Sequence, residues 1–292
     1  MRCRFLIILL IISSLTAYSQ TNHSLYFNGN VGMNSLIYSI DGGGSKPKLG
    51  FGGKVGYIYH FSPNWGIGTG VGFSFCATNG YLNGAVVSFE NQIDDQGDKY
   101  RGDFYFRNWQ EKQTFFLAEV PVFIHYLYDF GLKKRREIYI YFGVKAQLPL
   151  MASYQVTDGE VEKKRHYYDW NCPMWGEMHG MGTEKNKGTS GNLSFPFDIS
   201  ASVGIGFSFE VSKIIDIYMG AAFDYGFLNL KQSSSGDLLY FDNSGQLQYR
   251  GILLSSAIEK ANFISVTGEI GMRFAIGKSF TGSGVYSRKQ KK

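Results

Sequence analysis

Eight ionisable residues stand at alternate positions inside otherwise apolar segments of the sequence. The cations Lys54, Lys145 and Arg273 are matched by the acids Glu119, Asp198, Asp224 and Glu269, with His125 among them. Opposite charges that share a dry interior are expected to pair and to hydrogen-bond, because an isolated charge there is costly. We therefore predict a structural charge network and favour it over an ion path, with His60 and His125 as members and not as catalytic groups.

A second candidate is the segment from Glu162 to Met181, EKKRHYYDWNCPMWGEMHGM, which concentrates histidines and aromatic side chains. Its candidate contact residues are His166, Tyr167, Tyr168, Trp170, Trp175 and His179. Exposed aromatic side chains concentrate binding energy, so this segment could contact a partner protein or a glycan. Packing of the same aromatics into a cap over the fold is an equally supported alternative.

The sequence favours neither a metal site nor an enzyme. The spacing of His166, Cys172 and His179 matches no tetrahedral zinc pattern, and the acidic turn 94–98 lacks the alternate ligand spacing of a calcium loop. No serine lies in a G-x-S-x-G motif. We therefore expect no metal, no cofactor and no catalytic residue.

The segments that contain these residues alternate between apolar and polar side chains with a period of two, which predicts strands. Between Ala261 and Lys278 an apolar set alternates with small or charged residues: Ile264, Val266, Ile270, Met272, Phe274 and Ile276. An apolar face opposite glycine and complementary charges suits a strand whose outside meets lipid and whose inside faces a polar lumen. A soluble lipocalin-type barrel would place the apolar set inside instead.

The same alternation recurs along the chain and predicts eight strands, at 25–35, 48–61, 65–75, 114–128, 138–150, 197–209, 217–229 and 261–278. Long and short connections alternate between them, as in outer-membrane barrels. The sequence thus predicts an all-β fold, an eight-stranded antiparallel up-and-down transmembrane β-barrel with long extracellular loops. Side chains are expected to fill a lumen of that size.

The long connections are predicted at 77–113, 157–191 and 232–260. The last has the pattern of a hairpin of its own, with 238–241 and 246–249 on either side of a turn at 243–245. If the pieces 86–90 and 104–106 entered the membrane, the strand count would become ten.

The first residues have the features of a secretory signal, since Arg2 and Arg4 precede an apolar run and small residues follow it. We predict a signal peptide at 1–19, the outer-membrane barrel domain at 20–278 and a basic periplasmic tail at 279–292. Without the two signal arginines the formal net charge of +5 falls to +3, too small to indicate a nucleic-acid partner. Cys76 and Cys172 remain after cleavage and could pair in an oxidising compartment.

Three short motifs carry a family resemblance. The run Phe116-Leu117-Ala118-Glu119-Val120-Pro121-Val122, followed by Tyr126, resembles the aromatic-Leu-x-Glu-(Ile/Val)-Pro strand of the PorT-like outer-membrane β-barrel family of Bacteroidetes. Gly143-Val144-Lys145 with Leu148-Pro149-Leu150 resembles the next strand of that family, and Gly271-Met272-Arg273-Phe274 its closing strand. Members mostly lack assigned activities, and the founding one is tied to type IX protein secretion.

We therefore expect a non-enzymatic protein of the Gram-negative outer membrane with both termini in the periplasm. It would be an accessory or structural subunit of a larger outer-membrane complex for secretion, assembly or uptake, or a surface-binding protein that uses its extracellular loops. Its partners would be outer-membrane lipid and another outer-membrane protein. The alternatives are a small transport or pore protein, which needs about 14 or more strands or an oligomeric pore, and, less favoured, an enzyme at the barrel rim.

Overall fold

The computed structural model of the chain describes residues 22–130, 136–169, 172–174, 181–186, 188–212, 214–231 and 236–276. The predicted signal peptide and basic tail lie outside the described residues, as do Trp170, Trp175 and His179. The described part of the chain contains no helix that is long and apolar enough to cross a membrane.

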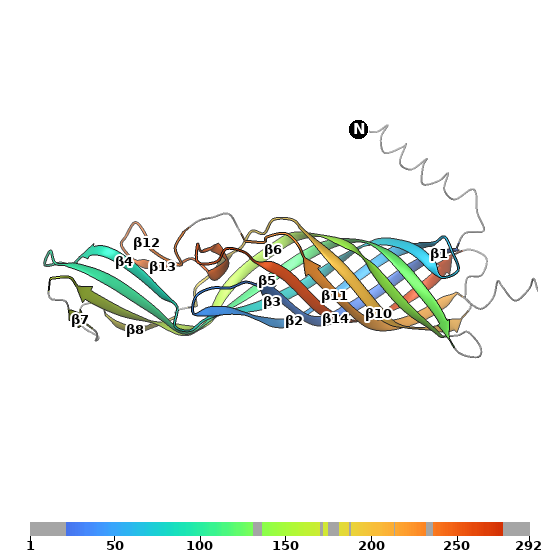
Figure 1. Ribbon diagram of the computed structural model, residues 1–292, viewed down its shortest axis with the longest axis horizontal. Coiled ribbons are helices and arrows are strands. Elements are labelled where there is room, and N and C mark those ends of the chain that lie inside the picture. Colours follow the sequence, from blue (N-terminus) through green and yellow to red (C-terminus); the bar gives the residue numbers. More distant parts are fainter. Residues whose placement is uncertain are drawn as a thin grey trace, which may run out of the picture.

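Eight strands pair side by side, each antiparallel to the next, and close into a ring. In ring order they are β1 (Asn22–Ile37), β2 (Gly43–His60), β3 (Trp65–Leu82), β5 (Lys99–Phe130), β6 (Arg136–Tyr167), β10 (Asp198–Ser212), β11 (Ile215–Gly226) and β14 (Asn262–Ile276). Every strand predicted from the alternation lies within one of these elements or overlaps it. The predicted eight-stranded antiparallel barrel is therefore confirmed (Figure 1).

The ring closes between the first and last strands of the chain. His23 of β1 is paired with Ile276 of β14, and Ile37 with Asn262. Both ends of the described chain therefore lie at the same end of the barrel, at the right of Figure 1.

The alternation separates an apolar outer face from a polar inner face. Outward-facing side chains remain accessible, with Val31, Leu49 and Ile270 at 59%, 69% and 60% exposure. Inward-facing polar side chains of the ring strands are buried, including Gln147 on β6 and Thr267 on β14. The apolar set is thus on the outside of the barrel, the arrangement of a barrel surrounded by lipid and the opposite of the lipocalin-type alternative.

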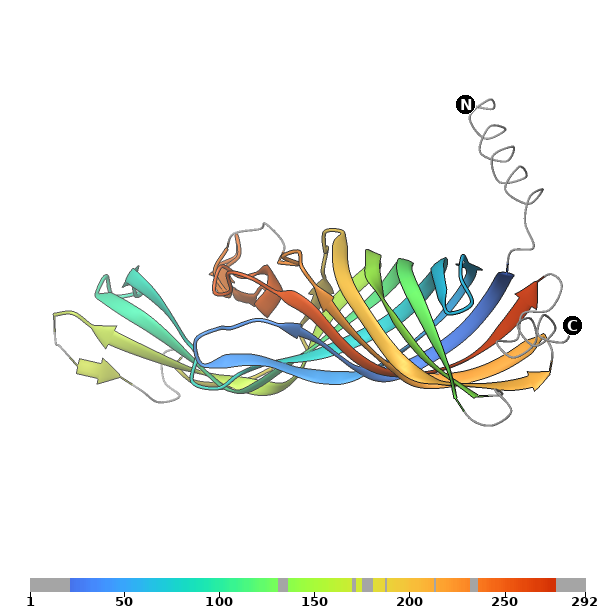
Figure 2. The same ribbon diagram turned by 45° about the vertical axis from the view of Figure 1, so that its right-hand side comes forward.

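Two strands continue far beyond the ring. β5 and β6 are each 32 residues long, and their outer ends remain paired from Arg107 with Glu160 to Tyr100 with Tyr167. Three short strands extend this sheet: β4 (Val86–Ile93) beside β5, and β7 (Cys172–Met174) and β8 (Gly182–Lys185) beside β6. We call this projecting sheet, residues 86–107, 160–169, 172–174 and 182–185, the arm; it extends to the left in Figures 1 and 2.

The arm corrects the prediction that 77–113 and 157–191 are loops. Much of both segments is strand, but a sheet that projects into solvent does not need one continuous apolar face, so its sequence lacks the clear alternation of the ring strands. The pieces at 86–90 and 104–106 do pair with each other. They do so within the arm, so the ring keeps eight strands.

Residues 236–262 fold over the end of the barrel from which the arm projects. They contain the predicted hairpin, found as β12 (Leu239–Phe241) and β13 (Leu247–Tyr249), and the short 3-10 helix η2 (Ile252–Leu254). The Tyr249 ring lies 4.8 Å from that of Trp109, and the Phe241 ring lies 5.1 Å from that of Phe89. We call this segment the cap; its packing braces the arm against the barrel.

Candidate functional site

The centre of the barrel holds a buried ion-pair group. Lys145 of β6 places its Nζ 2.7 Å from Oδ2 of Asp224 on β11 and 3.5 Å from Oε2 of Glu119 on β5. All three side chains are almost fully buried. Glu119 also accepts hydrogen bonds from Ser74 at 2.7 Å and from Gln147 at 3.3 Å. Ion pairs joined by additional hydrogen bonds are the form in which charges are tolerated in a dry interior.

A second carboxylate, Glu269 of β14, is held by neutral donors. The hydroxyls of Tyr139 and Tyr141 donate to it at 2.8 and 3.2 Å, and the amide of Asn28 donates at 3.1 Å. These donors come from β6 and β1, so the Glu269 carboxylate connects opposite walls of the barrel. The group thus links β1, β6 and β14 through side-chain hydrogen bonds.

Arg273 forms a third group nearer the open end of the barrel. Its guanidinium lies 2.6 Å from Glu137 and 2.8 Å from Asp216. Period-two counting places both acids on the inner face, because Glu137 is two residues before Tyr139 and Asp216 is next to the outward Ile217. That signal was available in the sequence, but both residues stand at strand ends, where the alternation is easy to overlook.

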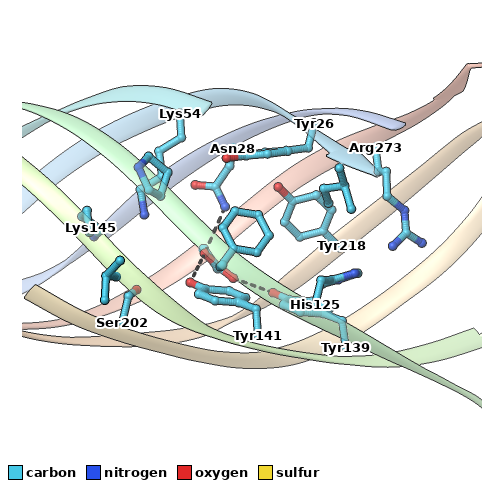
Figure 3. A pocket seen from close by; sticks show the side chains of 15 residues that line it. Tyr26, Asn28, Lys54, His125, Tyr139, Tyr141, Lys145, Ser202, Tyr218 and Arg273 are labelled. Carbon is cyan, nitrogen blue, oxygen red and sulfur yellow. Dashed lines mark hydrogen bonds between the residues drawn. The ribbon is translucent and has the colours of Figure 1, made fainter. Parts of the chain in front are cut away.

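A small cavity of about 60 Å³ lies between these groups, lined by Lys54, Tyr26 and Tyr218 together with residues of the Glu269 and Arg273 groups (Figure 3). A volume of this size admits a few water molecules and no larger solute. Lys54 lines it but takes part in none of the ion pairs between described residues. The cavity therefore suits bound water better than a substrate.

The remaining predicted members of the network lie apart from Lys145. His125 is buried with its ring 5.9 Å from that of His60 and 6.1 Å from that of Tyr139. Asp198 is buried near the cap and accepts a hydrogen bond from the backbone N–H of Leu228 at 3.1 Å. The structure thus places all eight predicted residues on the inner side of the barrel, in separate groups instead of one network.

The cap closes the end of the barrel above Asp198 with an apolar cluster. Its fully buried members include Leu36, Leu82, Phe106, Ile252 and Ile258. One carboxylate, Glu111, is enclosed with them and accepts hydrogen bonds from Gln113 at 2.7 Å, Tyr249 at 2.7 Å and the N–H of Ile252 at 3.0 Å.

Burial raises the pKa of the Glu111 carboxyl above its ordinary value, and the three hydrogen bonds oppose that shift only in part. Sequence reasoning missed Glu111 because it assigned residues 77–113 to a solvated loop. The carboxylate links β5 to both the hairpin and η2, so it fixes the position of the cap.

The arm carries the described part of the second predicted site. His166 and Tyr167 lie in β6 opposite Arg101 and Tyr100, and Tyr168 follows directly. The Tyr167 hydroxyl donates to Asp94 at 2.9 Å, and the Tyr168 hydroxyl donates to Glu90. His166 and Tyr167 belong to a regular sheet instead of a loop, and Tyr168 lies in the turn that follows.

The face of the arm that carries His166 also carries charged side chains that pair with one another. Arg107 pairs with Glu162, which also lies 3.4 Å from Nζ of Lys164, and that ammonium is 4.6 Å from the centre of the Tyr105 ring. Cross-strand pairs of this kind stabilise an exposed sheet. The face is therefore ordered before any partner arrives.

No group of three or more histidine, cysteine or acidic side chains in the described ranges is arranged to hold a metal ion. Cys76 is a free, buried thiol, so its possible disulfide with Cys172 is not formed in this structure.

No protein-family model matches the chain, and no curated protein sequence matches it. Solved structures similar to it include Ail, the attachment invasion locus protein of Yersinia pestis (15% identity, 87% of this chain and 99% of that chain covered, TM-score 0.29). Neisserial surface protein A is similar at 10% identity (86% and 96% covered, TM-score 0.31). A major outer membrane protein from Thermus thermophilus is similar at 12% identity (87% and 99% covered, TM-score 0.34).

Proposed function

We propose that the chain is an outer-membrane barrel that holds a rigid arm above the membrane for contact with another protein, as an accessory subunit of an outer-membrane complex or as a surface-binding protein. The observation that carries this proposal is the continuity of β5 and β6 from the ring into the arm. A shared pair of strands holds the arm in a fixed direction, which reduces the entropy lost when a partner binds.

The outer-membrane location is supported by the outer face of the barrel. Large apolar side chains are exposed on all eight ring strands, for example Phe27, Phe73, Phe142 and Phe207. A continuous exposed belt of this kind is not stable in water and is expected on a barrel surrounded by lipid. The contact with membrane lipid follows from the same belt.

The filled interior supports an anchoring role over a transport role. The ion-pair groups, the tyrosines around Glu269 and the cap together occupy the barrel from its middle to its capped end. An eight-stranded barrel is only wide enough for such side chains. We therefore place the function in the arm and not in the lumen.

The motifs shared with the PorT-like family agree with an accessory role in a secretion complex. They include Glu119, Lys145 and Arg273, which serve inside the barrel. All three motifs lie in the barrel strands and none lies in the arm. They therefore support membership of a secretion complex, whereas the contact surface is inferred from the arm itself.

A variant without the arm tests the proposal. The N–H of Phe106 donates to the carbonyl of Ala85, and the N–H of Asn186 donates to the carbonyl of Gly159. Short Gly-Ser turns can therefore join Ala85 to Phe106 and Gly159 to Asn186 with the ring intact. Both chains would be tagged, released from native membranes in mild detergent, and analysed by quantitative mass spectrometry.

We expect the full chain to recover an outer-membrane partner at a fixed ratio and the armless variant to lose it. Heat-dependent electrophoretic mobility, which is typical of folded barrels, controls for folding. Equal recovery of the partner by both chains would contradict a role for the arm. Recovery of the full chain outside the outer-membrane fraction would contradict the location.

A further inference from the structure

The pairing of β1 with β2 stops before either strand ends. Their last paired residues are Asn34 and Lys48, after which β1 continues beside β14 only and the segment Gly43 to Pro47 of β2 continues beside β3 only. The two strands thus separate towards the capped end of the barrel. They leave a break in the backbone pairing of the wall, crossed by a hydrogen bond of 3.0 Å from the N–H of Leu36 on β1 to the hydroxyl of Thr78 on β3.

A groove of about 740 Å³ lies at this break, on the outside of the barrel. Its apolar walls are Met33, Ile37, Pro47 and Val266, and its polar lining includes the serines Ser35, Ser39 and Ser45. Met33, Ile37 and Val266 belong to the exposed outer face. The groove therefore begins in the apolar belt and ends among hydroxyl groups.

Cations lie beside the polar end of the groove. Lys46 stands between two lining residues, Ser45 and Pro47, and its Nζ lies 4.8 Å from the centre of the ring of Tyr81, which also lines the groove. Lys46 is opposite Asn79, and Asn79 is opposite Lys112, so one row across β2, β3 and β5 carries two exposed lysines. No acid interrupts this row.

The row marks the upper boundary of the apolar belt. Below it on the same strands the outward residues are Phe51, Phe73 and Val120, all exposed and apolar. Strand edges facing hydrocarbon would leave backbone groups without hydrogen-bond partners, which lipid does not tolerate. At the level of the lipid headgroups, the backbone groups of the same strand edges can form hydrogen bonds with polar atoms.

We propose that this groove binds a phosphorylated membrane lipid. Its phosphate would lie beside Lys46 and accept hydrogen bonds from the hydroxyls of Ser39 and Ser45, while Lys112 would add positive charge from two strands away. Its acyl chains would lie along Met33, Ile37 and Val266. Charge complementarity and the continuity of the groove with the apolar belt favour a lipid over a free phosphate or a peptide. The inference rests on the proposed membrane location.

The test uses the folded full chain in detergent micelles that contain phosphatidylglycerol and phosphatidylcholine with identical acyl chains. Native mass spectrometry counts the lipids that stay bound. Lys46 beside the headgroup and Lys112 farther from it predict a preference for phosphatidylglycerol of about tenfold. We expect the double variant K46Q/K112Q to lose most of that preference.

Two further variants distinguish lipid binding in the groove from a general effect of positive charge on the protein. Ser39→Trp would fill the groove and keep both lysines, so it should lose the bound lipid. K99Q/K185Q removes the same amount of charge from the arm and should keep the wild-type preference. No preference in the wild type, or an unchanged preference in Ser39→Trp or in K46Q/K112Q, would overturn the proposal.

A photoreactive phosphatidylglycerol provides a measurement that needs no variant. Cross-links in wild-type protein should fall within residues 33–47, at Tyr81 or within residues 264–266, which line the groove. Cross-links confined to residues outside this lining would also overturn the proposal. Membrane fractionation reports separately on location. A chain found in the outer membrane without the lipid preference would refute the groove and leave the proposed function standing.

Discussion

The ammonium of Lys145 on β6 lies 2.7 Å from the Asp224 carboxylate on β11, although β10 separates these two strands in the ring. The pair therefore reaches across the interior. Glu119 approaches the same ammonium from β5, so one cation connects three strands.

Removal of one partner of this pair should be strongly destabilising. Asp224→Ala leaves the buried Lys145 charge with the more distant Glu119 only, and we expect a loss of roughly 3–5 kcal/mol in the free energy of unfolding. Urea titration of the protein in lipid vesicles measures it.

The control is Lys163→Met, which breaks the more exposed pair with Glu184 in the arm and should change stability by about 1 kcal/mol or less. Losses of similar size at the two sites would show that the interior pair has no special importance.

Inward glycines provide the space for the interior tyrosines. A Cβ on Gly220 would lie 2.3 Å from the Tyr139 hydroxyl and 2.4 Å from the Ile205 carbonyl oxygen, whereas a Cβ on the outward Gly29 would meet nothing within 4 Å. Gly220→Ala should therefore destabilise the barrel by roughly 1–3 kcal/mol. Gly29→Ala should be neutral or slightly stabilising, and the temperature at which electrophoretic mobility changes compares the two.

The cap should be less stable at high pH. Burial raises the pKa of Glu111 in the folded protein above its unfolded value of 4.5, so the folded state binds more protons. The stability of the cap is then complete below the unfolded pKa and falls as pH rises through the folded pKa.

Hydrogen exchange at the Ile252 and Leu254 amides, corrected for the intrinsic rate, should therefore show more opening at pH 8 than at pH 5. Glu111→Gln should remove this pH dependence. Opening of the cap that is independent of pH in the wild type would contradict the link between the raised pKa of Glu111 and the stability of the cap.

Removal of the cap should not open a pore. The N–H of Ser256 donates to the carbonyl of Gly236 at 2.7 Å, so a direct link between them deletes the hairpin and η2. We expect no steady current in planar bilayers from the full chain or from this deletion, because the Lys145 and Glu269 groups still fill the lumen. A stable open current from the full chain would favour the transport alternative instead.

The alternation in the sequence determined the eight ring strands and the face on which each of their residues lies. This worked because a strand surrounded by lipid on one side and a polar lumen on the other must alternate throughout its length. The inner positions of Lys145, Glu269 and Arg273 followed from the same rule.

Only the tertiary structure decided which inner residues meet. The contact of Lys145 with Asp224 depends on the stagger of all eight strands when the ring closes, and no local pattern encodes that quantity. The arm was likewise not predicted, because a solvent-exposed sheet carries polar residues in a pattern typical of loops. The hairpin of the cap was predicted from the sequence, but its packing over the end of the barrel was not. Burial of Glu111 required the cap to fold back over β5, a long-range contact that becomes visible only in three dimensions.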